Sequence, residues 1–153
     1  MNRKIYSNLS IENLIKTEWF NQFDEYQKDE IMKGIEADLD VLLYAKSEFD
    51  WFQMKEIRFG LKANLDVSIY AKKEFNNWQM YQIFTGLEKG LNVSVYAKKY
   101  FNEEQMREIR LGLETNLDVS KYIKKEFDWK SMKKIRRKLE KEAREKLENE
   151  QNT

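Results

Sequence analysis

The chain contains no cysteine, no histidine and no proline, and only five of its 153 residues are glycine. The absence of cysteine excludes disulfides, thiolate nucleophiles and cysteine-ligated zinc or iron–sulfur sites. The absence of histidine removes the commonest general base and the commonest metal ligand. Because linkers are usually rich in proline and glycine, we expect one continuous domain, 1–153, that frays before about residue 8 and after about residue 146.

Long apolar runs and an excess of charge of one sign are also absent. No stretch approaches the roughly 18 apolar residues of a membrane span, and the segment 1–10 lacks the apolar stretch of a signal peptide. The net charge is +1, although 36% of the residues are charged, so no whole-protein field favours nucleic acid or membrane. We therefore expect a cytoplasmic protein, in the cell that makes it or in a host, that does not bind membranes.

What the sequence does contain is a repeat of 26 residues. A clear unit runs from Phe49 to Phe75, and its pattern recurs twice more before dissolving after Ile135 into a longer charged segment. We assign 23–126 to four repeats, 1–22 to a degenerate N-terminal cap and 127–153 to a C-terminal capping helix with a frayed tail, because terminal repeats must cap a stack. The repeated glycines and methionines are Gly34, Gly60, Gly86, Gly112, Met54, Met80, Met106 and Met132.

Each unit predicts a long helix followed by a short one. In the long helix, an N-cap such as Asp50 is followed three residues later by Gln53, the spacing of a capping box. Phe49, before the cap, has the spacing to pack on Met54 as a hydrophobic staple. The long helices should end at residues that tolerate the left-handed conformation, namely Asp38, Asn64, Gly90 and Asn116.

The second helix should be about seven residues long, with an N-cap such as Asp66 and lysines in its last turn. Neither helix can bury an apolar face alone, whereas stacked copies can. We therefore predict an all-α solenoid of about ten helices, alternately long and short and capped at both ends. The repeated glycines lie late in the long helices, where we expect them to permit close approach of the short helix. A phosphate-binding loop is not indicated, because no glycine-rich cluster exists.

The strings QMREIRLGLE (105–114) and LDVSKY (117–122) resemble short repeats of the type "QMxxIRxGLExGLDVSxYA" in proteins of Gram-positive bacterial mobile elements and phages. The resemblance covers about residues 23–136. It differs at Asn64 and Asn116, where glycine is usual, and at Phe84, where arginine is usual. It implies no catalytic residue. It does imply a mobile-element context, in which small proteins are often inhibitors of host defence, including anti-CRISPR proteins.

Exposed lysines are the first candidate for a binding surface. They recur at one position of each unit, so a solenoid would align them into a stripe able to follow a phosphate backbone. The alternative is that they are only solvated cations near helix ends, interleaved with glutamates. The set comprises Lys46, Lys72, Lys73, Lys98, Lys99, Lys124 and Lys125.

The charge is also unevenly distributed along the chain. Residues 1–50 hold 6 basic and 11 acidic residues, and residues 121–140 hold 9 basic and 3 acidic residues. The acidic end could meet a basic groove, and the basic end could contact nucleic acid or an acidic protein face. The alternative for the basic end is a solvated helix. Its cations are Lys130, Lys133, Lys134, Arg136, Arg137 and Lys138.

Three tryptophans, Trp51, Trp78 and Trp129, fall in the first turn of predicted long helices. Tryptophan is a common interface anchor, but packing between repeats is an alternative use. Trp51 and Trp78 differ by one position in their units, so we expect one of them to be exposed.

No residues form a pattern that indicates an enzyme, a metal site or a cofactor site. Carboxylate pairs occur, as in any chain with 27 acidic residues, but none lies in an apolar run that would raise its pKa. We therefore expect a non-enzymatic protein without a cofactor. Its main function would be to bind a protein partner, as an anti-CRISPR-like inhibitor of a host defence nuclease. Two alternatives are a nucleic-acid-binding module and a structural scaffold repeat, and the oligomeric state is open.

Overall fold

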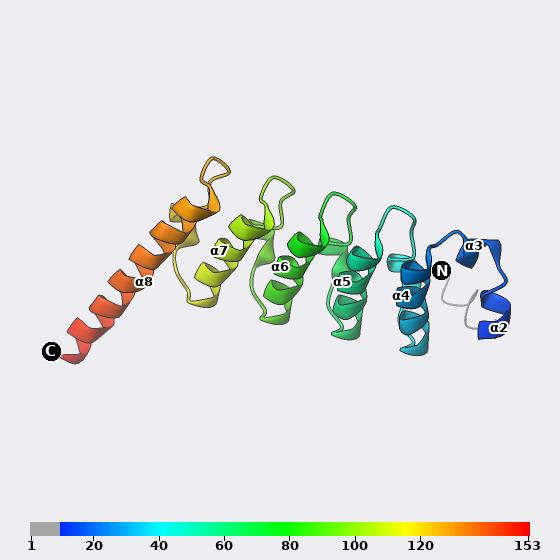
Figure 1. Cartoon of the computed structure of the whole chain (residues 1–153). Helices are drawn as coiled ribbons and strands as arrows, with labels where there is room; N and C mark the ends of the chain where they lie inside the picture. Colours follow the sequence, from blue (N-terminus) through cyan, green and yellow to red (C-terminus); the bar gives the residue numbers. More distant parts are fainter. Residues whose placement is uncertain (1–9) are drawn as a thin grey trace. The chain divides into compact units, whose positions relative to one another are not determined.

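The computed structural model describes residues 10–153, and in that range it contains α-helices and short 3-10 helices but no strand. These residues form two compact units, the first ending at Met80 and the second comprising Tyr81–Thr153. The prediction of an all-helical chain is confirmed for the described residues (Figure 1). The fraying expected before residue 8 lies outside them.

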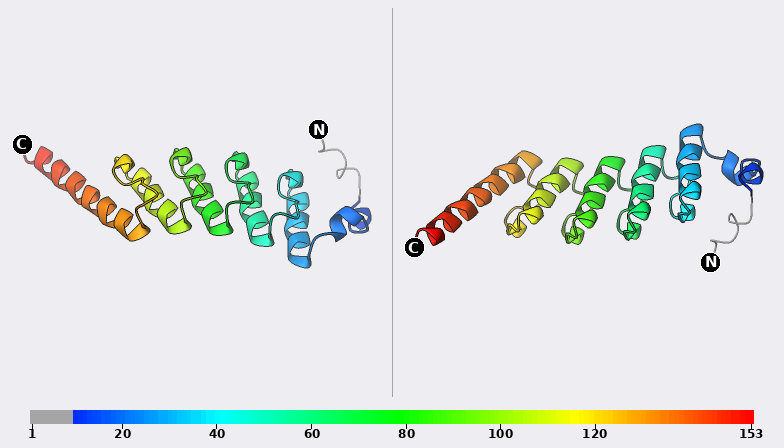
Figure 2. Two further views of the ribbon diagram at one scale, coloured as in Figure 1. Left: turned by 90° about the horizontal axis from the view of Figure 1, so that it is seen from above. Right: turned by 90° about the horizontal axis from the view of Figure 1, so that it is seen from below.

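In unit 1, two four-residue helices precede a pair of twelve-residue helices that pack on each other, α4 and α5 (Figure 2). A 3-10 helix follows each of the two long helices. The elements of this unit are α2 (Ile11–Leu14), α3 (Glu18–Asn21), α4 (Glu25–Glu36), η1 (Val41–Leu43), α5 (Trp51–Lys62), η2 (Val67–Ile69) and the start of α6 (Asn77–Glu88).

Unit 2 begins inside α6 and repeats the same pattern. Its helices α7 and α8 pack on each other, and α8 is the longest helix of the described residues at 23 residues. The remaining elements are η3 (Val93–Val95), α7 (Glu103–Glu114), η4 (Val119–Lys121) and α8 (Trp129–Gln151).

The predicted caps of the long helices are confirmed. Asp50 accepts from the Gln53 backbone N–H at 2.9 Å, and the Gln53 side chain accepts from the Asp50 N–H at 2.9 Å. The Gln53 amide then donates to the Phe75 carbonyl at 2.7 Å, so one side chain ties the helix start to the following loop. At the other end Asn64 has a φ of 57° and the Leu65 N–H donates to the Gly60 carbonyl at 2.9 Å, a Schellman-type closure.

The predicted seven-residue second helix is wrong. Each second helix is a 3-10 turn of three residues, such as Val67–Ile69, and the chain leaves helical geometry at Tyr70, whose φ is −126°. The reason is the tyrosine itself: its hydroxyl donates to the Glu56 carbonyl at 2.9 Å, and reaching that carbonyl turns the backbone away from the helix. The repeated lysines therefore lie in the loops that follow the 3-10 helices and not in a helix.

The repeated glycines make room for this tyrosine. A Cβ atom on Gly60 would lie 2.0 Å from the Tyr70 hydroxyl oxygen and 2.7 Å from Val67 Cγ1. The expected close approach of the following short element is thus confirmed, and the contacts are the same at the other three glycines. The core of each repeat is built around such tyrosines and the methionine and isoleucine of the long helix, all fully buried at Tyr44, Tyr70, Tyr96, Tyr122, Met54, Met80, Met106, Ile57, Ile83 and Ile109.

Candidate binding surfaces

Exposed aromatic side chains occupy the same position in three consecutive long helices. Tyr26, Phe52 and Trp78 are the second residues of α4, α5 and α6, spaced 26 residues apart, and they are 67%, 46% and 61% exposed. The Trp51 ring joins two of them, because it stacks on Tyr26 at 5.5 Å and on Phe52 at 3.6 Å between centroids. All of these residues belong to unit 1. We call this set, Tyr26, Trp51, Phe52 and Trp78, the aromatic surface.

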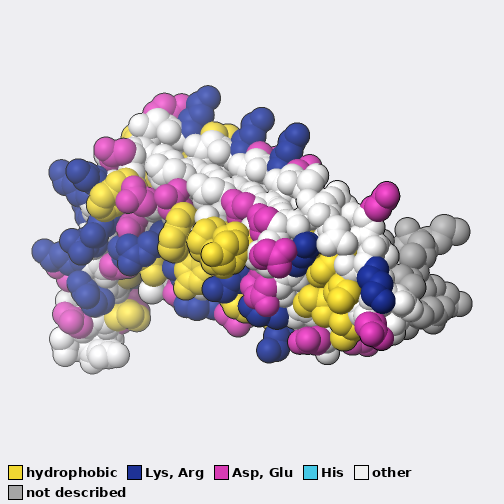
Figure 3. Space-filling model, turned by 45° about the vertical axis from the view of Figure 1, so that its right-hand side comes forward, with side chains coloured by type: hydrophobic (Ala, Val, Ile, Leu, Met, Phe, Trp, Pro, Cys, Tyr) yellow, Lys and Arg dark blue, Asp and Glu magenta, His cyan; other side chains and the backbone are white. Residues whose placement is uncertain are grey.

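The aromatic surface answers the question about the tryptophans. Trp78 is exposed, as expected of one of the two. Trp51 is only partly exposed and its ring stacks on Tyr26 of α4, so it packs between repeats, the alternative use expected for these tryptophans. Acidic side chains are exposed beside Tyr26, namely Glu25 and Asp29. Hydrophobic groups of this kind lie among charged side chains of both signs in Figure 3.

A second surface lies on the first turns of α8. Trp129, Lys130, Lys133, Lys134 and Arg137 line one hollow of about 400 Å³. The ammonium groups of Lys130 and Lys133 lie over the Trp129 ring, 5.7 and 5.6 Å from its centroid. The structure thus brings together five of the residues singled out in the sequence. We call them the α8 basic hollow.

Arg136 does not belong to this hollow, so its assignment to a binding surface is wrong. Its guanidinium is buried, and its Nε donates to Glu108 of α7 at 2.8 Å while NH1 donates to Glu140 at 2.5 Å. Leaving such a cation unpaired inside the protein would be costly. Arg136 therefore holds α8 against α7 and is not available to a partner.

The pair of Arg136 and Glu108 is one member of a buried polar series that the sequence analysis missed. Arg58 donates to Glu30 at 2.8 Å, and Arg110 donates to Gln82 at 3.0 Å. In each case the arginine lies 28 residues after its acceptor, an offset that corresponds to no spacing within one helix. Both kinds of partner recur in most repeats at a spacing of 26 residues, which is visible in the sequence, but only the fold shows which residues pair.

Glu56 is the exception in this series. The residue 28 positions later is Phe84 and not an arginine, and Glu56 Oε2 is buried without a hydrogen-bond partner. Burial raises the pKa of this carboxyl group, and nearby Lys55 opposes the shift.

The repeated lysines are all exposed. Exposure is expected both of a binding stripe and of a set of solvated cations, so it does not distinguish the two alternatives. Within unit 1, Lys46 and Lys72 line the same hollow of about 440 Å³, whose apolar lining includes Leu43 and Leu65. Lys124 lies over the Phe127 ring at 5.3 Å. Nothing else distinguishes this lysine set from solvated cations.

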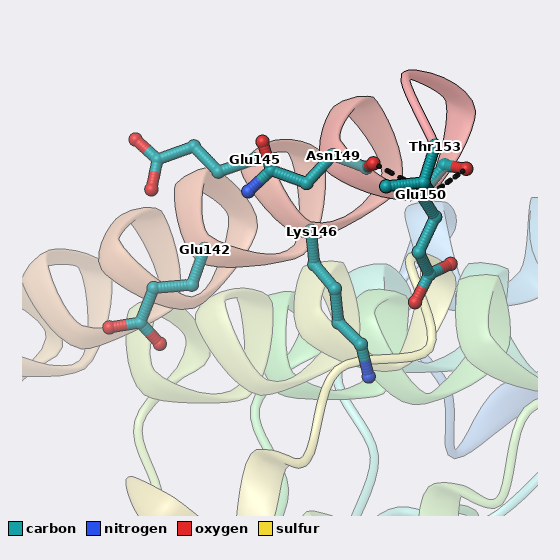
Figure 4. Close-up of a pocket in the computed structure, with 6 residues that line it drawn as sticks. All are labelled: Glu142, Glu145, Lys146, Asn149, Glu150 and Thr153. Carbon is teal, nitrogen blue, oxygen red and sulfur yellow. Dashed lines mark hydrogen bonds between the residues drawn. The ribbon is translucent and has the colours of Figure 1, made fainter.

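A third hollow, of about 540 Å³, is shallow and lies on the last turns of α8 alone (Figure 4). Thr153 donates there to the Asn149 and Glu150 carbonyls at 3.4 and 3.2 Å. Its charged groups are Glu142, Glu145, Lys146 and Glu150, and all of them are exposed. The hollow therefore does not enclose a charged group away from solvent.

Among residues 10–153, no helix is long and apolar enough to cross a membrane, and no three acidic side chains are grouped to hold a metal ion. Comparison with protein-family models, with curated proteins and with solved structures finds no match.

Proposed function

We propose that the chain is a non-enzymatic α-solenoid that binds a protein partner through the aromatic surface of its acidic N-terminal half. The observation that supports this most strongly is that Tyr26, Phe52 and Trp78 are exposed at one repeat position. Packing does not require an aromatic there, because the equivalent residues of α7 and α8 are Glu104 and Lys130. Large exposed aromatics are typical anchors of protein interfaces.

The charge around this surface favours a partner with a basic face. Residues 1–50 carry 11 acidic and 6 basic residues, so this part of the chain stays acidic although Glu25 and Asp29, beside Tyr26, are paired with Lys28 and Lys33. Aromatic rings attract arginine and lysine through their faces, and carboxylates attract the same cations. Such a surface suits the basic groove of a nucleic-acid enzyme, which fits the mobile-element context implied by the resemblance. We therefore propose as the specific role the stoichiometric inhibition of a host defence nuclease, in the manner of an anti-CRISPR protein.

The test is a protection assay in bacteria that carry an active CRISPR nuclease or another defence nuclease. We expect the chain to restore phage plaques or plasmid uptake, and the purified nuclease to form a complex of fixed stoichiometry with it. The triple variant Tyr26→Ala, Phe52→Ala, Trp78→Ala should fold, since these side chains are exposed, yet lose both effects. Tyr100→Ala removes an exposed aromatic elsewhere (56% exposed) and serves as the matched control.

Two results would count against the proposal in different ways. A triple variant that binds and protects as well as the wild type would remove the aromatic surface from the interface. A chain that protects against none of the nucleases and only associates with itself in light scattering would replace inhibition by a scaffold role.

A further inference from the structure

We infer that the α8 basic hollow is a binding site for single-stranded nucleic acid, with phosphates on its four cations and a base stacked on Trp129. This site lies in unit 2 and shares no residue with the aromatic surface, which lies in unit 1. Its residues are Trp129, Lys130, Lys133, Lys134 and Arg137.

The four cations form one face of a helix. Counted from Lys130, they stand at i, i+3, i+4 and i+7, the spacing of residues that lie above one another on an α-helix. Their charges span about 10 Å along the axis. Like charges at these spacings repel and weaken a helix, so α8 would be more stable without this arrangement. A ligand that neutralises the charges removes the repulsion.

No carboxylate of the described residues lies within ion-pair distance of these four cations. The nearby acids have other partners: Glu140 accepts from Arg136, and Asp128 caps α8 by accepting from the Ser131 N–H at 2.7 Å. Further along, Glu142 and Glu145 are paired with Lys138 and Lys141 at 4.0 and 3.8 Å. The positive charge of the hollow is therefore available to an anion.

The repeat itself does not demand these residues. At the equivalent positions α7 carries Glu103, Glu104, Arg107, Glu108 and Leu111. Lys134 is exposed and stands where α4, α5, α6 and α7 carry Glu30, Glu56, Gln82 and Glu108. The terminal helix thus reverses the charge of the face while keeping the core residue Met132 buried.

Trp129 decides the class of ligand. The ring is partly exposed and has two ammonium groups within 6 Å of its centroid, so an aromatic face lies directly beside cations. A nucleotide offers the matching pair, a flat base and a negative phosphate, and single strands bind proteins by this combination of stacking and charge. Poly-glutamate offers the charge alone.

The experiment measures fluorescence anisotropy of a labelled oligo-dT of about 20 nucleotides against the full chain, over a salt series starting at about 50 mM. We expect binding that weakens as salt rises, with a log–log slope between about −2 and −3 if all four cations contact phosphates. Tryptophan fluorescence should be quenched on binding, and the quench should be lost in Trp129→Phe.

Lys133→Glu, Lys134→Glu should weaken binding at least tenfold. The control Lys16→Glu, Lys62→Glu makes the same change in net charge on exposed lysines of unit 1 that belong to no candidate surface, and it should change affinity less than threefold. Equal losses in the two variants, no binding at low salt, or equal competition by poly-glutamate of the same charge would each overturn the site. These outcomes are independent of the proposed protein partner, because the triple aromatic variant should bind oligo-dT normally.

Discussion

Replacing Gly60 by alanine probes the contact that the whole repeat shares. On an exposed helix this change would stabilise the protein by about 1 kcal/mol, because alanine is the better helix former. Here the added Cβ would lie 2.0 Å from the Tyr70 hydroxyl oxygen and 2.7 Å from Val67 Cγ1. Both neighbours are buried, so neither can move aside into solvent.

The expected size follows from three contributions. Overpacking a core by one methyl group costs about 1–3 kcal/mol. Pushing the Tyr70 hydroxyl off the Glu56 carbonyl, which it reaches at 2.9 Å, loses a hydrogen bond worth about 1 kcal/mol. The gain in helix propensity offsets about 1 kcal/mol. We therefore expect Gly60→Ala to lower the free energy of unfolding by about 1–3 kcal/mol.

A double-mutant cycle with Tyr70→Phe isolates the clash. Tyr70→Phe alone should cost about 1 kcal/mol through the lost hydrogen bond. It also removes the atom nearest to the new Cβ, leaving Val67 Cγ1 at 2.7 Å and Tyr70 Cζ at 3.1 Å. The double variant should thus be more stable than the sum of the single effects predicts, by about 1 kcal/mol.

Urea unfolding followed by circular dichroism measures all four corners of the cycle. Gly90→Asn is the control, because Gly90 has a φ of 70° with nothing within 4 Å of a Cβ there, and Asn64 and Asn116 already occupy that repeat position. It should change stability by less than about 0.5 kcal/mol. A stabilised Gly60→Ala, or effects that add to within about 0.5 kcal/mol, would refute the account of the repeated glycine.

Two further predictions concern titrating groups. Burial raises the pKa of Glu56 in the folded state, so its contribution to stability is full below its unfolded pKa and is lost as the pH rises through the folded pKa. Glu56→Gln should therefore raise the urea midpoint at about pH 7 and change it little at about pH 4. The comparison variant Glu30→Gln weakens the ion pair with Arg58 at 2.8 Å, so it should lower the urea midpoint at about pH 7. Burial also raises the pKa of the repeat tyrosines, so their contribution is full below about pH 10 and is lost above it. The urea midpoint should fall steeply above about pH 10, with a shallower fall in Tyr70→Phe, and the tyrosine absorbance should show delayed ionisation of Tyr44, Tyr70, Tyr96 and Tyr122.

The local features of the fold were predictable because they depend on neighbours in sequence. The capping box of Asp50 and Gln53 and the left-handed residue Asn64 follow from side-chain chemistry within a few positions. The length of the second helix of each repeat was not predictable in this way. Leu65, before the N-cap Asp66, and Tyr70, after it, have the spacing of a hydrophobic staple, which favours a helix. The Tyr70 hydroxyl instead donates to the Glu56 carbonyl, 14 residues earlier, and this tertiary bond overrides the local preference.

The candidate sites show the same difference between features set by neighbours in sequence and features set by tertiary contacts. Lys130, Lys133, Lys134 and Arg137 could be found from spacing on one helix. Arg136 has the same chemistry and lies among them, but its role depends on Glu108, 28 residues away on α7. Which of several neighbouring cations is free is a property of packing, and no pattern within α8 separates them.

Repetition limits which positions are free to vary from one repeat to the next. Residues such as Met54, Gly60 and Tyr70 must recur, because each repeat packs through the same contacts and a change at one of these residues disrupts that packing. The second residue of each long helix is free of that requirement, and its identity changes along the chain from Tyr26, Phe52 and Trp78 to Glu104 and Lys130. Three consecutive exposed aromatics carry an aggregation risk, which the protein partner proposed above would remove by covering them.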